Sequence, residues 1–181
     1  MGLFGPSISD HYDGAIRAMA DEVMNSIAKE RILYDRERLT THLVHKYAFS
    51  EIKPTGLDRA TPNDNGTEIL IRIGVEKHTD VPKLLGLEGQ SVSSAPYDLG
   101  YNDGYIEYRL THFNAEQAKE EVKRISNRII EQEIHPRNEA VRLGNERFMR
   151  ELNATLDEKT RQLKAGEERR SALEEQLKDL K

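Results

Sequence analysis

The chain has 181 residues, of which 36% are hydrophobic and 33% are charged, so it can bury one modest core and must leave much of its length in water. It contains no cysteine, which excludes disulfides, thiol nucleophiles and cysteine-ligated zinc. Its 27 basic and 32 acidic residues give a net charge of -5 and are interleaved, unlike the basic clusters typical of nucleic-acid binding.

The first predicted element is an amphipathic helix from about Asp10 to about Leu33. Apolar residues recur there at helical spacing: Ile16, Met19, Ala20, Val23 and Ile27. The following stretch, 36–52, fits two structures, because leucines recur every four residues while apolar residues near Tyr47 also alternate. We favour a helix that runs on toward a strand near Tyr47.

An exposed loop and then a strand are predicted next. The segment 53–66 contains Pro54, Gly56, Pro62 and an Asn-Asp-Asn-Gly cluster, all of which favour turns. From 67 to 76, isoleucine and valine alternate with polar residues, as in a half-buried strand. This is the clearest strand pattern in the chain.

A β-hairpin is predicted around Asp103-Gly104, a pair that suits the left-handed conformations of a tight turn. Its strands are 95–101 and 105–113, and a short apolar patch at 81–87 precedes them. Three strands this short need cover on their apolar face. We therefore expect the N-terminal helix to lie over them in an α+β layer.

Two helices are predicted in the last third. Asn114 can cap the first, and Pro136 should stop or kink it near His135, because proline clashes with the preceding helical turn. The predicted fold is α+β, a small and mostly antiparallel sheet covered by an N-terminal helix and followed by long C-terminal helices ending in a coiled-coil-like segment. Residues 1–114 should form a head domain and residues 115–181 a helical stalk.

The final helix carries apolar residues at alternating spacings of three and four, which we call the heptad stripe. Lys159, Gly166 and Arg170 occupy stripe positions and should weaken its middle. Leucine side chains on an isolated helix would remain exposed to solvent, so the stripe predicts association with a second copy or another protein. A stripe that reaches Lys181 fits an oligomerising tail or a coiled coil that continues. The predicted interface residues are Met149, Leu152, Leu156, Leu163, Leu173, Leu177 and Leu180.

Tyrosines concentrate in the hairpin region, where Tyr97, Tyr101 and Tyr105 would form a recognition surface. Cross-strand packing of the same rings, with Tyr108 in the core, is the stronger interpretation.

Acidic side chains around the predicted sheet give an enzymatic alternative. Glu107-Tyr108-Arg109 is similar to the acid-x-base element of metal-dependent nuclease cores, in which carboxylates hold a divalent ion that activates water. Those cores have lysine where Arg109 stands, and a solvated strand face explains the acidic residues better. The carboxylates of this alternative, a phosphodiester hydrolase, are Asp64, Glu68, Asp98 and Glu107.

The sequence therefore predicts a non-enzymatic protein–protein interaction or assembly module that oligomerises through its C-terminal helix. No metal or cofactor is expected, since His42 and His45 lack a third ligand. No apolar run or N-terminal pattern predicts a membrane span or a signal peptide, so we expect a cytoplasmic protein. Nucleic-acid binding is unsupported, because its candidate residues have acidic neighbours; the candidates are Lys123, Arg124, Arg128, Arg142 and Arg147.

Overall fold

The computed structural model describes residues 8–77, 79–87 and 98–178 and divides into two compact units. One unit contains Phe49–Arg142, and the other contains Ser9–Ala48 together with Leu143–Lys181. Each unit thus draws on both predicted domains, 1–114 and 115–181. The division into a head domain, 1–114, and a helical stalk, 115–181, stays a prediction.

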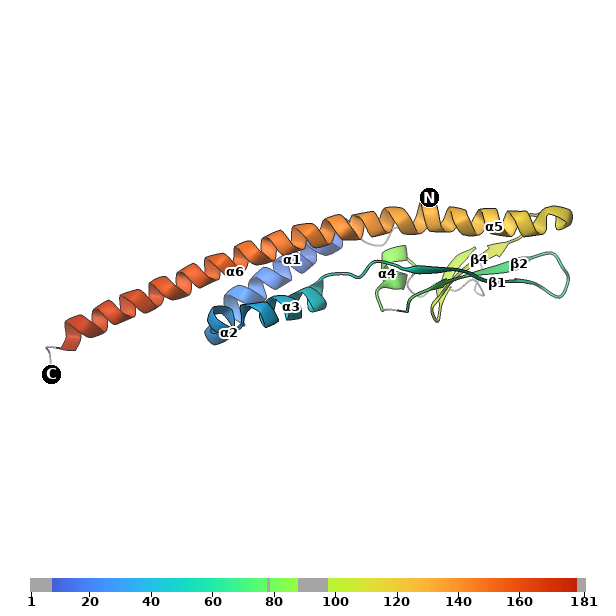
Figure 1. Ribbon diagram of the computed structural model, residues 1–181. Coiled ribbons are helices and arrows are strands. Elements are labelled where there is room, and N and C mark those ends of the chain that lie inside the picture. The colour runs from blue at the N-terminus through green and yellow to red at the C-terminus, as the bar shows by residue number, and fades with distance from the viewer. Residues whose placement is uncertain (1–7, 78, 88–97, 179–181) are drawn as a thin grey trace. The chain divides into compact units, whose positions relative to one another are not determined.

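The first unit is built on a four-stranded antiparallel sheet with the order β1-β2-β4-β3 (Figure 1). The strands are β1 (Pro54–Pro62), β2 (Ile69–Val75), β3 (Leu99–Asn102) and β4 (Tyr105–Leu110). Ile73 lies opposite Ile106 and Ile71 opposite Tyr108, so the alternating isoleucines share one buried face. The α+β class, the β2 strand and the hairpin at Asp103-Gly104 are confirmed.

Strand β1 occupies a segment that was predicted to be a loop. Two prolines are tolerated because they stand at the ends of an edge strand, where one side of the backbone needs no partner. The pairing shifts register between Pro54 and Gly56 and again between Leu57 and Arg59, which absorbs the turn-forming residues as bulges. Only 63–68 forms the turn, in which the Asn63 side chain accepts from the backbone of Thr67 at 2.9 Å.

Gly74 in β2 is required by a close neighbour on β1. A Cβ atom at this position would lie 2.3 Å from Thr55 Oγ1. We expect Gly74→Ala to lower the free energy of unfolding by about 1–3 kcal/mol, the usual cost of overpacking. In a Thr55→Ala background most of this loss should disappear, because the Thr55 Cβ is 3.7 Å away. Urea unfolding of the single and double variants measures the coupling, and equal losses in both backgrounds would contradict the contact.

Helix α5 (Ala118–Ile129) lies against β1 and β2 of this sheet (Figure 1). It buries one stripe, Val122, Ile125 and Ile129, and the Asn114 side chain caps the preceding turn η1 (Ala115–Gln117) as predicted. A short helix, α4 (Val81–Leu85), contributes further core residues. We expected the N-terminal helix to lie over the sheet. That helix, α1 (Ile8–Asn25), belongs to the other unit, because its apolar stripe is buried among helices there.

A helix stop or kink was predicted near His135. The chain stays helical there, and only the pattern of its backbone hydrogen bonds changes. A π-helical turn, η2 (Ile130–Ile134), precedes α6 (His135–Leu177), and Pro136 stands in the first turn of α6. The wider π turn relieves the clash that the Pro136 ring would cause in a regular α-helix, and Pro136 has no N–H to donate in either geometry. Close by, the Asn138 amide bonds both the backbone N–H and the C=O of Ile52, each at 2.7 Å.

The second unit consists of helices. Beside α6 it contains α1 (Ile8–Asn25), α2 (Lys29–Tyr34) and α3 (Arg36–Tyr47). The predicted single helix over 10–33 is thus broken after Asn25, whereas the helical interpretation of 36–47 is confirmed. The fully buried large side chains of this unit are Tyr12, Met19, Ile32, Leu39, Leu43, Phe148 and Leu152.

Candidate interaction surface on the C-terminal helix

The first half of the heptad stripe is covered by the chain's own helices. Leu152 and Leu156 are both 0% exposed, and the neighbouring Phe148 places its ring 6.1 Å from the ring of Tyr47 on α3. Met149 and Leu163 are half-buried. Four of the predicted interface residues are therefore wholly or partly buried within one copy.

Helices α1 and α3 run along α6 in opposite directions. The Tyr12 hydroxyl at the start of α1 donates to Asn145 Oδ1 at 2.5 Å, and the end of α1 meets Lys159 further along α6. In α3 the order reverses, because Arg36 pairs with Asp157 at 2.6 Å while Tyr47 meets Phe148. The stripe thus lies in the groove between two antiparallel helices.

Lys159 is one of the polar residues that were expected to weaken the heptad stripe. Its ammonium group donates to the backbone carbonyl of Met24 at 2.7 Å, in the last turn of α1. The final carbonyl groups of a helix have no hydrogen-bond partner within the helix and lie at the negative end of its dipole. A cation there donates the missing hydrogen bond and interacts favourably with the dipole. Lys159 is a capping residue for another helix, and the stripe is well packed beside it.

Glu22 on α1 contacts α3 in a polar cluster whose contribution to the stability of the fold depends on pH. Its carboxylate accepts from Lys46 Nζ at 2.7 Å and from the Tyr47 hydroxyl at 2.6 Å. These two bonds hold the pKa of Glu22 below its usual value of 4.5, and the bond from Lys46 is the larger cause. A carboxyl group with a lowered folded-state pKa stabilises the fold above its unfolded-state pKa, and that stabilisation is lost as pH falls through the folded value.

We therefore expect Glu22→Gln to cost about 0.5–1 kcal/mol at neutral pH, the range of a partly exposed ion pair. The difference between wild type and variant should shrink as the pH falls below about 4.5 toward 3. Denaturant unfolding across this range measures it. A difference that stays constant with pH would show that the charge of Glu22 plays no part.

The second half of the heptad stripe lies in water. The ion pair of Lys29 with Glu167, at 2.8 Å, joins α2 to α6, and each residue from 168 to 177 is exposed. Leu173 is 57% exposed and Leu177 is 55% exposed. Figure 1 shows α6 continuing past α2 toward the C-terminus. We call residues 168–177 the C-terminal segment.

An ion pair runs along the helix in the C-terminal segment. Arg170 Nε donates to Glu174 Oε1 at 2.8 Å, one turn further on. Leu173 and Leu177 are also one turn apart, so they lie together on one side of the helix. Leu180 continues the spacing in the sequence and lies outside the described residues.

Two of the three tyrosines of the predicted recognition surface, Tyr101 and Tyr105, lie in the described part of the chain. Tyr101 pairs with Ile106 across the hairpin, so both point to the face that carries the isoleucines. Tyr105 is the neighbour of Ile106 in β4 and points to the opposite face. Tyr97 lies outside the described residues. The two described tyrosines of the predicted recognition surface are thus separated by the sheet.

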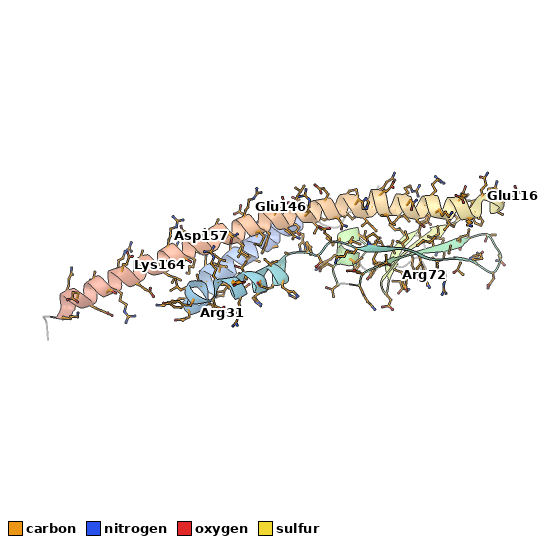
Figure 2. The ribbon with its side chains drawn as sticks, in the orientation of Figure 1. Arg31, Arg72, Glu116, Glu146, Asp157 and Lys164 are labelled. Atoms are coloured by element: carbon orange, nitrogen blue, oxygen red, sulfur yellow. The ribbon has the colours of Figure 1, made fainter. Side chains whose placement is uncertain are left out.

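The four carboxylates of the hydrolase alternative are not gathered either. Glu107 is only 4% exposed and accepts a hydrogen bond from Arg72 Nε at 2.9 Å. Figure 2 shows Arg72 on the side of the sheet away from α5. Asp64 stands in the β1–β2 turn, with Glu68 at its end, and Asp98 precedes β3. Within residues 8–77, 79–87 and 98–178, no three histidine or acidic side chains are grouped to hold a metal ion.

Several basic residues considered for nucleic acid are neutralised by neighbours. Arg142 pairs with Glu139 at 2.7 Å, Arg147 with Asp13 at 2.7 Å, and Lys123 with Glu120 at 3.4 Å. In the described part of the chain, no helix is both long and apolar enough to cross a membrane.

Comparisons with protein-family models, with curated proteins and with solved structures gave no match for this chain.

Proposed function

We propose that this protein is a non-enzymatic protein–protein interaction or assembly module that oligomerises through the C-terminal segment of α6. The observation that carries the proposal is the pair Leu173 and Leu177, which are more than half exposed on one side of a helix whose other half buries Leu152 and Leu156 of the same stripe completely. Apolar side chains aligned at helical spacing are the usual contacts of a partner helix.

The proposed interface contains fewer residues of the heptad stripe than the sequence predicted. Leu152 and Leu156 already pack inside one copy, so a partner meets only the part of the stripe beyond Glu167. Burying an exposed leucine contributes about 1.5–3 kcal/mol, whereas association costs about 4–15 kcal/mol in lost freedom of movement. An interface of two or three leucines per copy is therefore weak, with a Kd on the order of 0.01–1 mM.

Sedimentation of the full chain between about 10 µM and 1 mM, a range that brackets this affinity, tests the proposal. The wild-type mass should rise with concentration. The double variant Leu173→Gln and Leu177→Gln should keep the monomer mass throughout, because glutamine retains helix propensity and removes the apolar contact. Ala172→Gln, at an exposed neighbouring position, is the matched control and should associate like wild type. A wild-type monomer at every concentration, or equal association by the double variant, would refute self-association through this segment.

A further inference from the structure

We propose that Asn65, in the turn between β1 and β2, is a site of spontaneous deamidation, a modification that replaces its side-chain amide by a carboxylate. Asparagine is among the chemically labile residues of proteins. The reaction needs only water and hydroxide, so the local structure decides where in the chain it occurs. Association through the C-terminal segment plays no part in it.

The reaction joins the Asn65 side chain to the backbone of Gly66. The Gly66 nitrogen forms a bond to the side-chain carbonyl carbon, the bond from this carbon to the amide nitrogen breaks, and ammonia leaves with the proton of the Gly66 N–H. Water then adds to either carbonyl group of the cyclic imide and opens it. The products are aspartate and isoaspartate, in which the backbone runs through the former side chain.

Gly66 leaves its nitrogen open to this reaction. Its φ is 64°, and nothing lies within 4 Å of the position where a Cβ atom would stand. Both Asn65 and Gly66 are exposed, so hydroxide and water reach the reacting atoms. Glycine has no side chain that would shield its backbone from a neighbouring group.

The Asn65 amide is also free to turn toward this nitrogen. Within residues 8–77, 79–87 and 98–178 it has no hydrogen-bond partner. The amide of Asn63, in the same turn, is held in place. Its oxygen accepts from the backbone N–H groups of Thr67 and Glu68 at 2.9 Å and 3.1 Å, and its nitrogen donates to Thr67 Oγ1 at 3.1 Å.

The other asparagines of the chain lack this combination. Asn65 alone precedes a glycine, and every other asparagine precedes a residue with a side chain. Within a helix the backbone N–H groups are also engaged by carbonyl groups one turn back. The asparagines in α5 and α6 are Asn127, Asn138, Asn145 and Asn153.

Asp103-Gly104, in the other hairpin turn, shows what protects such a pair. The Asp103 side chain is a carboxylate, whose negative charge resists attack by a nucleophile. Lys77 donates a hydrogen bond to it, and this bond holds the pKa of Asp103 below its usual value of 3.8. Gly104 is buried. Asn65 has a neutral amide instead, next to an exposed glycine.

The turn itself controls the rate. The Gly66 N–H donates to the backbone carbonyl of Asn63 at 3.0 Å. Gly66 must release this bond before its nitrogen can lose the proton and attack, so the reaction proceeds from the opened turn. The bonds that the Asn63 side chain makes to Thr67 and Glu68 oppose that opening. Asn63 therefore slows the modification of Asn65.

The product affects the end of the β1–β2 hairpin. It adds one negative charge near Asp64 and Glu68, and isoaspartate also adds one carbon to the backbone. The turn is closed by a backbone bond from the Asn63 N–H to the carbonyl of Glu68 at 2.9 Å, next to the pairing of Pro62 with Ile69. Repulsion between like charges and a longer backbone both weaken this closure.

Peptide mass spectrometry of the full chain, incubated in mildly alkaline heavy-oxygen water, tests the proposal. Opening of the imide places one solvent oxygen in each product, so the label marks the reacted residue. It should accumulate at Asn65 several-fold faster than at any other asparagine, as aspartate and isoaspartate. The rate should rise with pH, because hydroxide removes the proton from the Gly66 nitrogen.

Three variants test the roles of the neighbours. Gly66→Asn should slow the reaction several-fold, because asparagine tolerates a positive φ but its side chain crowds the nitrogen. Asn63→Ala should speed it by about two- to tenfold, the change in opened population expected when one net hydrogen bond is lost. Asn127→Ala, at an exposed position in α5, is the matched control and should leave the rate unchanged.

The opposite results would overturn the proposal. Label that fails to concentrate at Asn65 would show that this turn is not a deamidation site. Aspartate without isoaspartate, or an equal rate in Gly66→Asn, would exclude attack by the backbone nitrogen. An unchanged rate in Asn63→Ala would show that the turn does not control the reaction.

Discussion

Leu152→Ala is expected to lower the free energy of unfolding by about 2–5 kcal/mol, which is the loss that follows when a fully buried leucine is truncated and leaves a cavity. Leu152 is 0% exposed, in the groove that α1 and α3 form on α6. The same change at Leu173, which is 57% exposed, should alter stability by no more than about 0.5 kcal/mol. The two residues occupy the same position of the heptad, three repeats apart.

Chemical unfolding of both variants at a few micromolar, a concentration well below the expected Kd, measures this contrast. Helix propensity contributes almost equally at the two sites, since both exchange leucine for alanine within α6. The comparison thus measures how side-chain burial alone affects the free energy of unfolding. Similar losses at Leu152 and Leu173 would show that the stripe is not divided between internal packing and a free surface.

Gly144→Ala is expected to destabilise the helical unit by about 1–3 kcal/mol, although alanine is the better helix former. A Cβ atom at Gly144 would lie 2.2 Å from the ring of Tyr12, which is 1% exposed and cannot move aside. At Gly166, in the same helix, nothing lies within 4 Å of the added carbon. Gly166→Ala should therefore raise stability by about 0.5–1 kcal/mol, the intrinsic preference of a helix for alanine over glycine.

Thermal or urea unfolding of the two variants should give shifts of opposite sign. A Tyr12→Ala background provides the internal check, because removing the ring should remove most of the penalty of Gly144→Ala. If Gly144→Ala and Gly166→Ala shifted stability in the same direction, the close approach of α1 and α6 at this point would be wrong.

Several elements were predictable from local patterns. The alternating isoleucines of 69–75, the Asp103-Gly104 turn and the Asn114 cap each act within a few residues of themselves, so their signals are complete in the sequence. Asp103 has a φ of 45° and Gly104 a φ of 92°, the left-handed conformations that the turn demands. Strand β1 escaped prediction because its prolines and glycine are tolerated only at an edge and at bulges, and an edge is a property of the whole sheet.

The predicted interface residues divide into buried and exposed positions, and their role in association stays a prediction. The heptad stripe was visible, but spacing alone does not state which side chains cover it. Lys159 interrupted the stripe in sequence and caps α1 in the structure. The sequence contained one signal for the cover of this stripe, the apolar stripe of α1, which needed an apolar surface to pack against. Both the sheet and α6 offered such a surface, so the pattern alone did not decide between them.

What this sequence determined by itself is the class of its elements: strands with alternating apolar residues, a long helix with a leucine stripe, and no cysteine chemistry. The tertiary structure alone decided that α5 lies on the sheet, that α1 and α3 bury Leu152 and Leu156, and that Leu173 and Leu177 stay in water. The reason is that local patterns fix how each segment hydrogen-bonds and which side is apolar, whereas the competition between surfaces for those apolar sides is settled only when the chain packs.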